Sequence, residues 1–148
     1  MGLILRGGMK IKKSIECWIF DTYQKKFLLL HCPETLRHRP YWQPVTGGIE
    51  NGETPFQSCL REIREETGKA FEKDNLVRLF NNYSVSIPED DMELNKNIFI
   101  VKTTGFDVRI STEHTDYKWV SPEQVRSMLL WESNKITFQE VAKYLGLS

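Results

Sequence analysis

The segment TGGIENGETPFQSCLREIREETGKAF, at residues 46–71, carries the pattern that decides the fold. Its three early glycines predict a turn in which the backbone can approach a ligand closely. Thr54 is a favourable N-cap residue and Pro55 suits the first position of a helix, so we expect a helix over residues 54–68. The segment therefore predicts a glycine-rich loop that leads directly into a helix.

The predicted helix has an apolar stripe with acidic side chains beside it. At about 100° per residue, the stripe is formed by Phe56, Cys59, Leu60 and Ile63. Glu62, Glu65 and Glu66 converge next to it, because positions three and four apart are neighbours on a helix surface. Like charges at this spacing repel by roughly 0.2–0.5 kcal/mol per pair, so we expect a cation or a basic partner among them.

Two interpretations of the acidic cluster are open. A hard divalent cation is a natural partner for grouped carboxylates, and Mg²⁺ commonly combines a few of them with water and substrate phosphates. A backbone carbonyl at Thr46 or Gly47 is then a candidate further ligand. The sequence REIREE alone is equally typical of a solvated helix. The combination with the glycine-rich turn, Glu53 and Arg61 favours the metal site.

The whole chain fits one soluble domain. Its 148 residues are enough for one core, so we expect a single domain over 1–148 with residues 1–10 as an N-terminal extension. Twenty basic side chains balance twenty acidic ones, which gives no overall field to attract a nucleic acid polymer or a membrane. No apolar run approaches the roughly 20 residues that span a bilayer, so a cytoplasmic location is expected.

Strand and helix signals alternate along the remaining sequence. We expect a hairpin from residues 14–20 and 26–32, a short extended piece at 40–48, strands at 76–87, 96–104 and 116–120, and helices at 121–130 and 135–146. Residues 88–95 are expected to form an acidic turn. This series indicates an α+β or α/β sandwich with a mixed sheet, whose strand order the sequence does not give.

Aromatic and sulfur-containing residues give further expectations about the core. The cysteines lie far apart in apolar segments, so buried free thiols are expected at Cys17, Cys32 and Cys59. Trp119 is expected in the core, and Trp131 and Phe138 are expected to anchor the last helix.

The spacing of polar residues closely resembles the Nudix box. Gly47 is followed after five residues by Glu53, and after seven more by the sequence REIREETG, so that the resemblance covers residues 47–69. Lys69 departs from the pattern, since that position is usually apolar. Ala70 or Phe71 is expected to supply the missing packing.

The resemblance implies an α/β/α sandwich with a mixed sheet and a hydrolase that depends on Mg²⁺ or Mn²⁺. Its substrates would be nucleoside diphosphates linked to another group. The resemblance makes Glu62, Glu65 and Glu66 metal-binding carboxylates, with the carbonyl at Thr46 or Gly47 as an additional ligand. It also makes Glu53 and Arg61 a structural ion pair, and Gly68 part of the same structural pattern.

A second segment, STEHTDYKWVSPEQV at residues 111–125, is similar to bacterial dihydroneopterin triphosphate diphosphatases, also described as dATP pyrophosphohydrolases. Its EHxxYxW element also resembles diadenosine tetraphosphate hydrolases. By analogy, Glu113 is a candidate metal ligand or general base. The alternative is an ordinary loop acid beside His114.

Substrate contacts are less clearly indicated. Arg37, His38 and Arg39 are candidates to meet phosphates, although a short basic run is commonly just solvated. Trp42 and Tyr83 are candidates to stack on a purine or pterin ring, although core packing is the usual role of such residues.

Three functions follow from these patterns. The first is a pyrophosphohydrolase of a nucleoside or pterin triphosphate, such as dATP or dihydroneopterin triphosphate. The second is a diadenosine polyphosphate hydrolase, and the third is a nucleotide-binding sensor without activity. The intact glutamates argue against the sensor. The sequence leaves a homodimer open.

Overall fold

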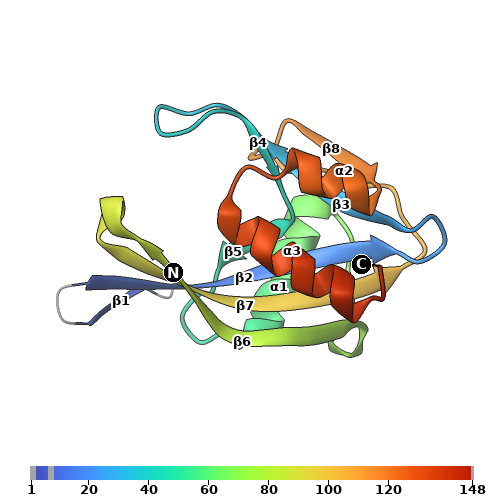
Figure 1. The fold of residues 1–148 in the computed structure, drawn as a ribbon. Coiled ribbons are helices and arrows are strands. Elements are labelled where there is room, and N and C mark those ends of the chain that lie inside the picture. The colour runs from blue at the N-terminus through green and yellow to red at the C-terminus, as the bar shows by residue number, and fades with distance from the viewer. Residues whose placement is uncertain (1–2, 7–8, 148) are drawn as a thin grey trace.

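The computed structural model describes residues 3–6 and 9–147. Eight strands form one sheet in the described residues: β1 (Leu3–Arg6), β2 (Met9–Asp21), β3 (Lys26–Cys32), β4 (Tyr41–Gln43), β5 (Val45–Gly48), β6 (Leu76–Ile87), β7 (Met92–Thr103) and β8 (Asp116–Val120). The helices are α1 (Pro55–Thr67), α2 (Pro122–Met128) and α3 (Glu132–Tyr144), with short 3₁₀ turns at Lys73–Asn75 and Pro88–Asp90. Figure 1 shows their arrangement.

The sheet is mixed, as predicted. Its main order is β4-β3-β2-β7-β6, with β1 and β5 also paired to β2 and β8 paired to β3. β2 and β7 run parallel from the pair Lys10↔Met92 to the pair Asp21↔Thr103, whereas the other pairs are antiparallel. The central strands therefore carry long apolar runs, as strands covered on both faces require.

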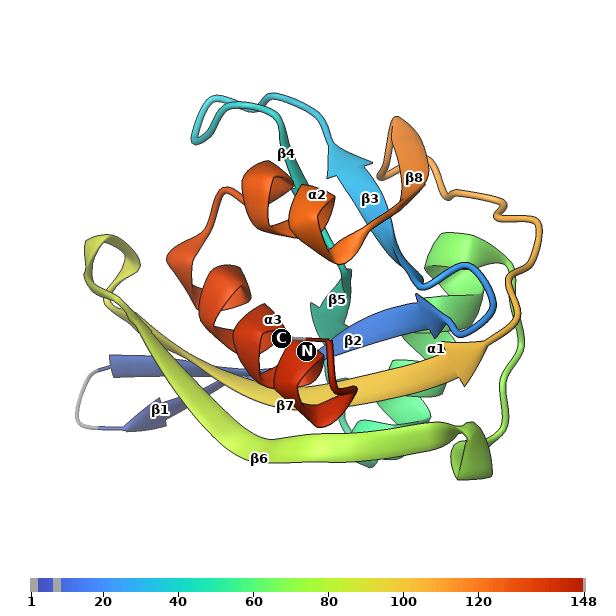
Figure 2. The same ribbon diagram turned by 45° about the vertical axis from the view of Figure 1, so that its right-hand side comes forward.

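Each face of the sheet packs against helices. Because side chains alternate along a strand, Ile15, Cys17 and Ile19 of β2 join the core beneath α1. Trp18 and Phe20 point the other way and join the core beneath α2 and α3. Figure 2 shows α1 and α3 on opposite sides of β2 and β7, which is the expected α/β/α sandwich.

The helix α1 begins and ends where the sequence predicts. The Thr54 hydroxyl accepts a hydrogen bond from the Gln57 backbone at 3.1 Å, and the Gln57 side chain accepts one from the Thr54 backbone at 2.9 Å. This reciprocal capping satisfies two N–H groups that otherwise lack partners. At the other end Gly68 adopts φ 78°, a left-handed conformation suited to glycine.

Several element boundaries differ from the prediction. The strand β7 begins at Met92, so residues 92–95, which were expected in a turn, are strand paired with both β2 and β6. The helix α3 begins at Glu132, before the expected residue 135. Part of the expected extension at residues 1–10 forms β1 and the start of β2, while residues 1, 2, 7 and 8 lie outside the described part.

The expectations for buried residues are mostly confirmed. All three cysteines are buried and free, and Phe138 is 1% exposed. Trp119 is partly buried and packs against the core beneath α1. The expectation for Trp131 is wrong: it precedes α3 as its N-cap residue, it is 40% exposed, and its ring faces Tyr41 instead of the core.

Lys69 does not disturb the end of α1. Phe71 packs against the core beneath α1, and the Lys69 ammonium lies 5.6 Å from the centre of the Phe71 ring. Phe71 therefore supplies the packing that an apolar residue at position 69 would give. Among the residues described, no helix is long and apolar enough to cross a membrane.

Candidate active site

Arg61 connects the glycine-rich loop to α1. Its Nε donates to Glu53 at 2.7 Å and its Nη2 donates to the other Glu53 oxygen at 3.0 Å. Nη2 also donates to the Gly48 carbonyl at 3.0 Å. Two parallel bonds of this kind are strong and directional. They lower the pKa of Glu53 and raise that of Arg61, so both stay charged and hold the loop against the helix.

The same guanidinium also reaches two glutamates of the acidic cluster. Arg61 Nη1 lies 2.7 Å from a Glu62 oxygen and 3.2 Å from a Glu65 oxygen. Glu62 is largely buried, with 13% of its side chain exposed, whereas 54% of the Glu65 side chain is exposed. Arg61 thus offsets part of the repulsion that the sequence pattern predicts within the cluster.

Gly47 lies directly against the Glu62 carboxyl group. A Cβ atom built at Gly47 would be 2.1 Å from Glu62 Cδ, closer than any real contact. The backbone of β5 can therefore approach α1 only because this residue has no side chain. The contact brings the Glu62 carboxyl group to β5, the strand that carries the Thr46 and Gly47 carbonyls.

Glu66 is the buried member of the cluster. The residue is 3% exposed, and its Oε2 has no hydrogen-bond partner among the described residues. Burial, followed by its contacts with Glu62, Glu113 and Glu65, raises the pKa of Glu66 to about 10. Without a cation, Glu66 therefore keeps its proton at neutral pH, because a second buried negative charge there is unfavourable.

His114 packs against Glu66 from the segment before β8. Its Nε2 lies 3.4 Å from Glu66 Oε1, and its side chain is 3% exposed. Burial is the main cause that lowers the pKa of His114, so the imidazole is neutral at neutral pH. Its Nδ1 also lacks a hydrogen-bond partner among the described residues. Two unsatisfied buried polar atoms thus lie in one place, which is unusual in a folded interior.

A cavity of about 270 Å³ lies beside these two residues. Its acidic side is formed by Glu66, Glu113 and His114 together with Thr46. Its other wall comes from β3, the following loop and β4, and consists of Cys32, Pro33, Thr35, His38, Tyr41 and Gln43. The structure thus brings Glu66 on α1 and Glu113, far away in the sequence, to one cavity.

An aromatic group stands at the edge of this wall. The Tyr41 ring lies 4.8 Å from the His38 ring and 5.3 Å from the Trp131 ring. Burial raises the pKa of Tyr41 to about 12, so its hydroxyl keeps its proton and remains a donor. Tyr41, Gln43 and Cys32 were not among the candidates from sequence. They reach the cavity through the β3–β4 pairing, for example Cys32↔Tyr41, which has no local sequence signal.

Four of the five substrate candidates from the sequence lie outside the lining of this cavity. Arg37 pairs with Asp90 of the turn between β6 and β7, and Arg39 is exposed. The Trp42 ring lies 4.7 Å from the His31 ring, with the Lys118 ammonium 5.1 Å from its centre. Tyr83 packs against the core beneath α3. Of the basic run, only His38 lines the cavity.

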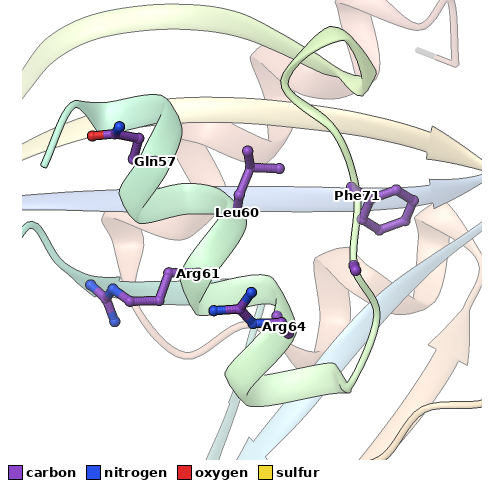
Figure 3. Close-up of a pocket in the computed structure, with 6 residues that line it drawn as sticks. Gln57, Leu60, Arg61, Arg64 and Phe71 are labelled. Atoms are coloured by element: carbon purple, nitrogen blue, oxygen red, sulfur yellow. The ribbon is translucent and has the colours of Figure 1, made fainter.

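A second hollow, of about 260 Å³, lies on the outer side of α1. Its lining consists of Gln57, Leu60, Arg61, Arg64, Ala70 and Phe71. Figure 3 shows four of these side chains along α1, with Phe71 on the segment that follows the helix. This hollow contains no carboxylate, so the acidic cavity is the better candidate for hydrolytic chemistry.

The acidic cavity suits the divalent cation that the resemblance implies. Glu62 is held by Arg61 and lies against Gly47, and the unpartnered Glu66 Oε2 offers a free ligand atom. Over residues 3–6 and 9–147, no group of three or more acidic, histidine or cysteine side chains is arranged to hold a metal ion. This is consistent with Mg²⁺, which commonly takes few protein carboxylates and completes its shell with water and phosphate oxygens.

Comparison with known proteins agrees with this geometry. The model of the NUDIX domain family matches residues 10–141. Mouse bis(5'-nucleosyl)-tetraphosphatase (asymmetrical) is 28% identical over 128 residues, which cover 84% of each chain. Dihydroneopterin triphosphate diphosphatase from Haemophilus influenzae is 27% identical over 115 residues, which cover 71% of each chain.

The fold has a similar counterpart among solved structures. The E. coli dihydroneopterin triphosphate pyrophosphohydrolase superposes with a TM-score of 0.73 at 22% identity, over 86% of this chain and 92% of the other. The chain therefore belongs to the Nudix family. It is a hydrolase that acts on acid anhydrides.

Proposed function

We propose that this protein is a divalent-metal-dependent pyrophosphohydrolase that cleaves a nucleoside triphosphate or a pterin triphosphate and releases pyrophosphate. The observation that carries the proposal is Glu66, a buried glutamate with an unpartnered oxygen that shares a cavity with Glu113. The relative from Haemophilus influenzae supports the substrate class. The family match over residues 10–141 supports one Nudix domain for the chain.

We assign the metal ligands to the acidic cluster. Glu66 and Glu113 line the cavity, Glu62 lies against Gly47 of β5, and Glu65 stands at the exposed edge next to Arg61. A carbonyl at Thr46 or Gly47 completes the proposed set. A divalent cation bound there neutralises phosphate charge and lowers the pKa of an attacking water.

The protein's own residues supply position and proton transfer. Arg61 holds Glu53, Gly48 and Glu62 in one rigid unit, so the carboxylates do not have to reorganise when the substrate arrives. A carboxylate of the cluster accepts the proton of the water, a step typically worth about 10²–10⁴-fold in rate. Thr35, His38 and Tyr41 line the opposite wall and offer polar contacts to the rest of the substrate.

A dinucleoside polyphosphate is the second candidate substrate. The mouse tetraphosphatase, which matches over 84% of both chains, favours it. The cavity volume of about 270 Å³ favours the first candidate, since small-molecule sites usually range over roughly 300–1,000 Å³ and two nucleosides need the upper part of that range.

One assay distinguishes these functions. Purified protein with Mg²⁺ is incubated with dATP, dihydroneopterin triphosphate, 8-oxo-dGTP and diadenosine tetraphosphate, and pyrophosphate, inorganic phosphate and nucleotides are measured. We expect pyrophosphate from a triphosphate. Two nucleotides from the tetraphosphate alone would favour the second candidate, and no product from any compound would favour the inactive sensor.

Matched variants test the assigned glutamates. Glu66→Gln removes the carboxyl group proposed to bind the metal, and Glu140→Gln removes a charge on the exposed side of α3. We expect the first to reduce kcat by at least 10²-fold, in line with the loss of a general acid-base or metal group, and the second to leave it unchanged. Full activity in Glu66→Gln would contradict the assignment.

A further inference from the structure

We propose that Glu16 and Lys96 are positioning residues that fix the first turn of α3, and with it Trp131, against the wall of the acidic cavity. Neither residue touches that cavity. The inference rests on the proposed function only for what the cavity binds, and the position of Trp131 can be tested independently of activity.

Glu16 on β2 is a fully buried carboxylate that accepts four hydrogen bonds. Its Oε1 accepts from Lys96 Nζ and from Asn134 Nδ2, both at 2.8 Å. Its Oε2 accepts from Trp18 Nε1 at 2.9 Å and from Thr137 Oγ1 at 2.6 Å. Two of these four donors belong to α3, so the carboxylate connects the middle of the sheet to that helix.

Lys96 on β7 adds a second connection to the same turn of α3. Its side chain is 6% exposed, and Nζ donates to Ser133 Oγ at 3.2 Å as well as to Glu16. Ser133, Asn134 and Thr137 therefore all bond to one buried ion pair. Figures 1 and 2 both show α3 lying across β2 and β7, the strands that carry the pair.

The hydrogen bonds of Glu16 and Lys96 to α3 determine the position of this helix more than they add to the stability of the fold. A buried ion pair often stabilises a fold no better than apolar side chains of the same size, because the charges lose their hydration. The other contacts of α3 with the sheet are apolar, through Phe138, Val141 and Ala142, and such contacts have little directional preference. Hydrogen bonds to fixed oxygens are directional, so the network sets where the first turn of α3 lies.

The first turn of α3 carries Trp131 to the cavity wall. The Trp131 carbonyl accepts from the Asn134 backbone at 3.1 Å, which connects it to the residue that bonds Glu16. Its ring lies 5.3 Å from the Tyr41 ring and 6.0 Å from the His38 ring, and both of these residues line the cavity. Trp131 is 40% exposed and packs on Tyr41 and His38 instead of in the core, so its position depends on the turn beneath it and on the nearby Trp42↔Leu129 bridge.

The sequence pattern agrees with a specific role. Glu16 interrupts the apolar run SIECWIF, and Lys96 stands at the start of the apolar run in β7. Charged residues are almost never fully buried unless they are paired. Glu16 and Lys96 also both lie outside residues 47–69, the segment that resembles the Nudix box. A leucine or methionine would serve the core at either position if packing were the only requirement.

The test compares three variants. Glu16→Leu/Lys96→Met removes both charges and leaves none unpaired. Thr137→Val removes one bond to Glu16 with almost no change of shape. Phe138→Leu is the control, because it weakens the same helix through apolar packing and removes none of the hydrogen bonds to Glu16 or Lys96. Melting temperatures and hydrogen exchange of backbone amides are measured in each, followed by KM and kcat for the best substrate.

We expect the double variant to keep a melting temperature close to that of the parent and to exchange faster at residues 131–137 only. Its KM should rise at least fivefold with kcat within twofold, and Thr137→Val should show a smaller change in the same direction. Phe138→Leu should melt lower, exchange faster at residues 138–144 and, because exchange at residues 131–137 is unchanged, keep its KM. If the double variant does not fold, the exchange at residues 131–137 and the KM of Thr137→Val test the inference instead.

Two results would overturn the inference. Unchanged exchange at residues 131–137 in Thr137→Val and in the folded double variant would show that the network does not fix this turn. Faster exchange with an unchanged KM would show that the turn does not control the cavity. If the parent protein hydrolyses none of the compounds, the dissociation constant of adenosine 5'-(α,β-methylene)triphosphate replaces KM. The exchange result does not depend on activity and still tests whether the network fixes the turn. A failure of this inference therefore remains distinguishable from a failure of the proposed function.

Discussion

Replacing Gly47 with alanine places a methyl group where the Glu62 carboxyl group now lies. The added Cβ would be 2.1 Å from Glu62 Cδ, and an ordinary van der Waals contact begins at 3.4 Å. The carboxyl group must therefore retreat by about 1.3 Å, since β5 is held in the sheet by its pairing with β2. Glu62 is thus expected to leave its place beside β5.

A displacement of this size is expected to reduce kcat/KM by about 100-fold, because a 1 Å misplacement of a catalytic group can cost that much. The loss corresponds to about 2.7 kcal/mol of transition-state stabilisation. Fold stability should change by less than about 1 kcal/mol, because Gly47 is not among the glycines with positive φ and alanine suits its backbone. Pyrophosphate release and urea unfolding measure the two quantities.

Gly146→Ala provides the matched control. Gly146 has φ 72° and nothing within 4 Å of the added Cβ, so the substitution strains the backbone without a steric clash. It should cost about 1 kcal/mol of stability and leave kcat/KM unchanged. Gly47→Ala is therefore expected to reduce activity with little effect on stability, and Gly146→Ala is expected to reduce stability with no effect on activity.

A double-mutant cycle can refute the steric reasoning. If Gly47 acts through Glu62, then Gly47→Ala should have little further effect in a protein that already carries Glu62→Ala, because the clashing group is gone. Additive losses in the double variant would show that alanine at position 47 acts by another route. Full activity of Gly47→Ala alone would show that the Glu62 position is not critical.

The remaining predictions concern pH. The raised pKa of Glu66 means that the folded, metal-free protein holds a proton that the unfolded chain releases, so its free energy of unfolding should fall as pH rises from about 4.5 to about 10. Because Mg²⁺ must displace that proton, its apparent affinity should rise by up to about tenfold per pH unit, and Glu66→Gln should lose this dependence in thermal melts. The lowered pKa of Glu53 contributes stability above pH of about 4.5 that is lost as pH falls through its folded-state value. Glu53→Gln should therefore unfold about 1–3 kcal/mol more easily at pH 7, and this difference should shrink as pH falls, as measured by urea titration.

The local parts of the site could be predicted from the sequence. The ends of α1 follow from Thr54 and Gly68, and the convergence of its glutamates follows from helical spacing. The pairing of Glu53 with Arg61 followed from the resemblance to the Nudix box and is present in the structure. Each of these features depends on residues within a few turns of one another.

The distant parts could not be predicted in this way. The parallel pairing of β2 with β7 joins residues about 80 positions apart, and no local pattern specifies it. The cavity wall depends on such pairings, since β3 and β4 bring Cys32 and Tyr41 opposite Glu66. The charge of Glu16 inside an apolar strand was a visible signal, but its partners on α3 appear only in the fold.

The most direct test of the central claim is a crystal structure with Mn²⁺ and a nonhydrolysable triphosphate analogue, in which anomalous scattering locates the metal. We expect manganese bound to the carboxylates of Glu62 and Glu66, next to the carbonyl of Thr46 or Gly47, with Glu113 facing the same cavity and phosphate oxygens completing its coordination. Manganese bound elsewhere, or an analogue bound while these carboxylates hold no metal, would contradict the account.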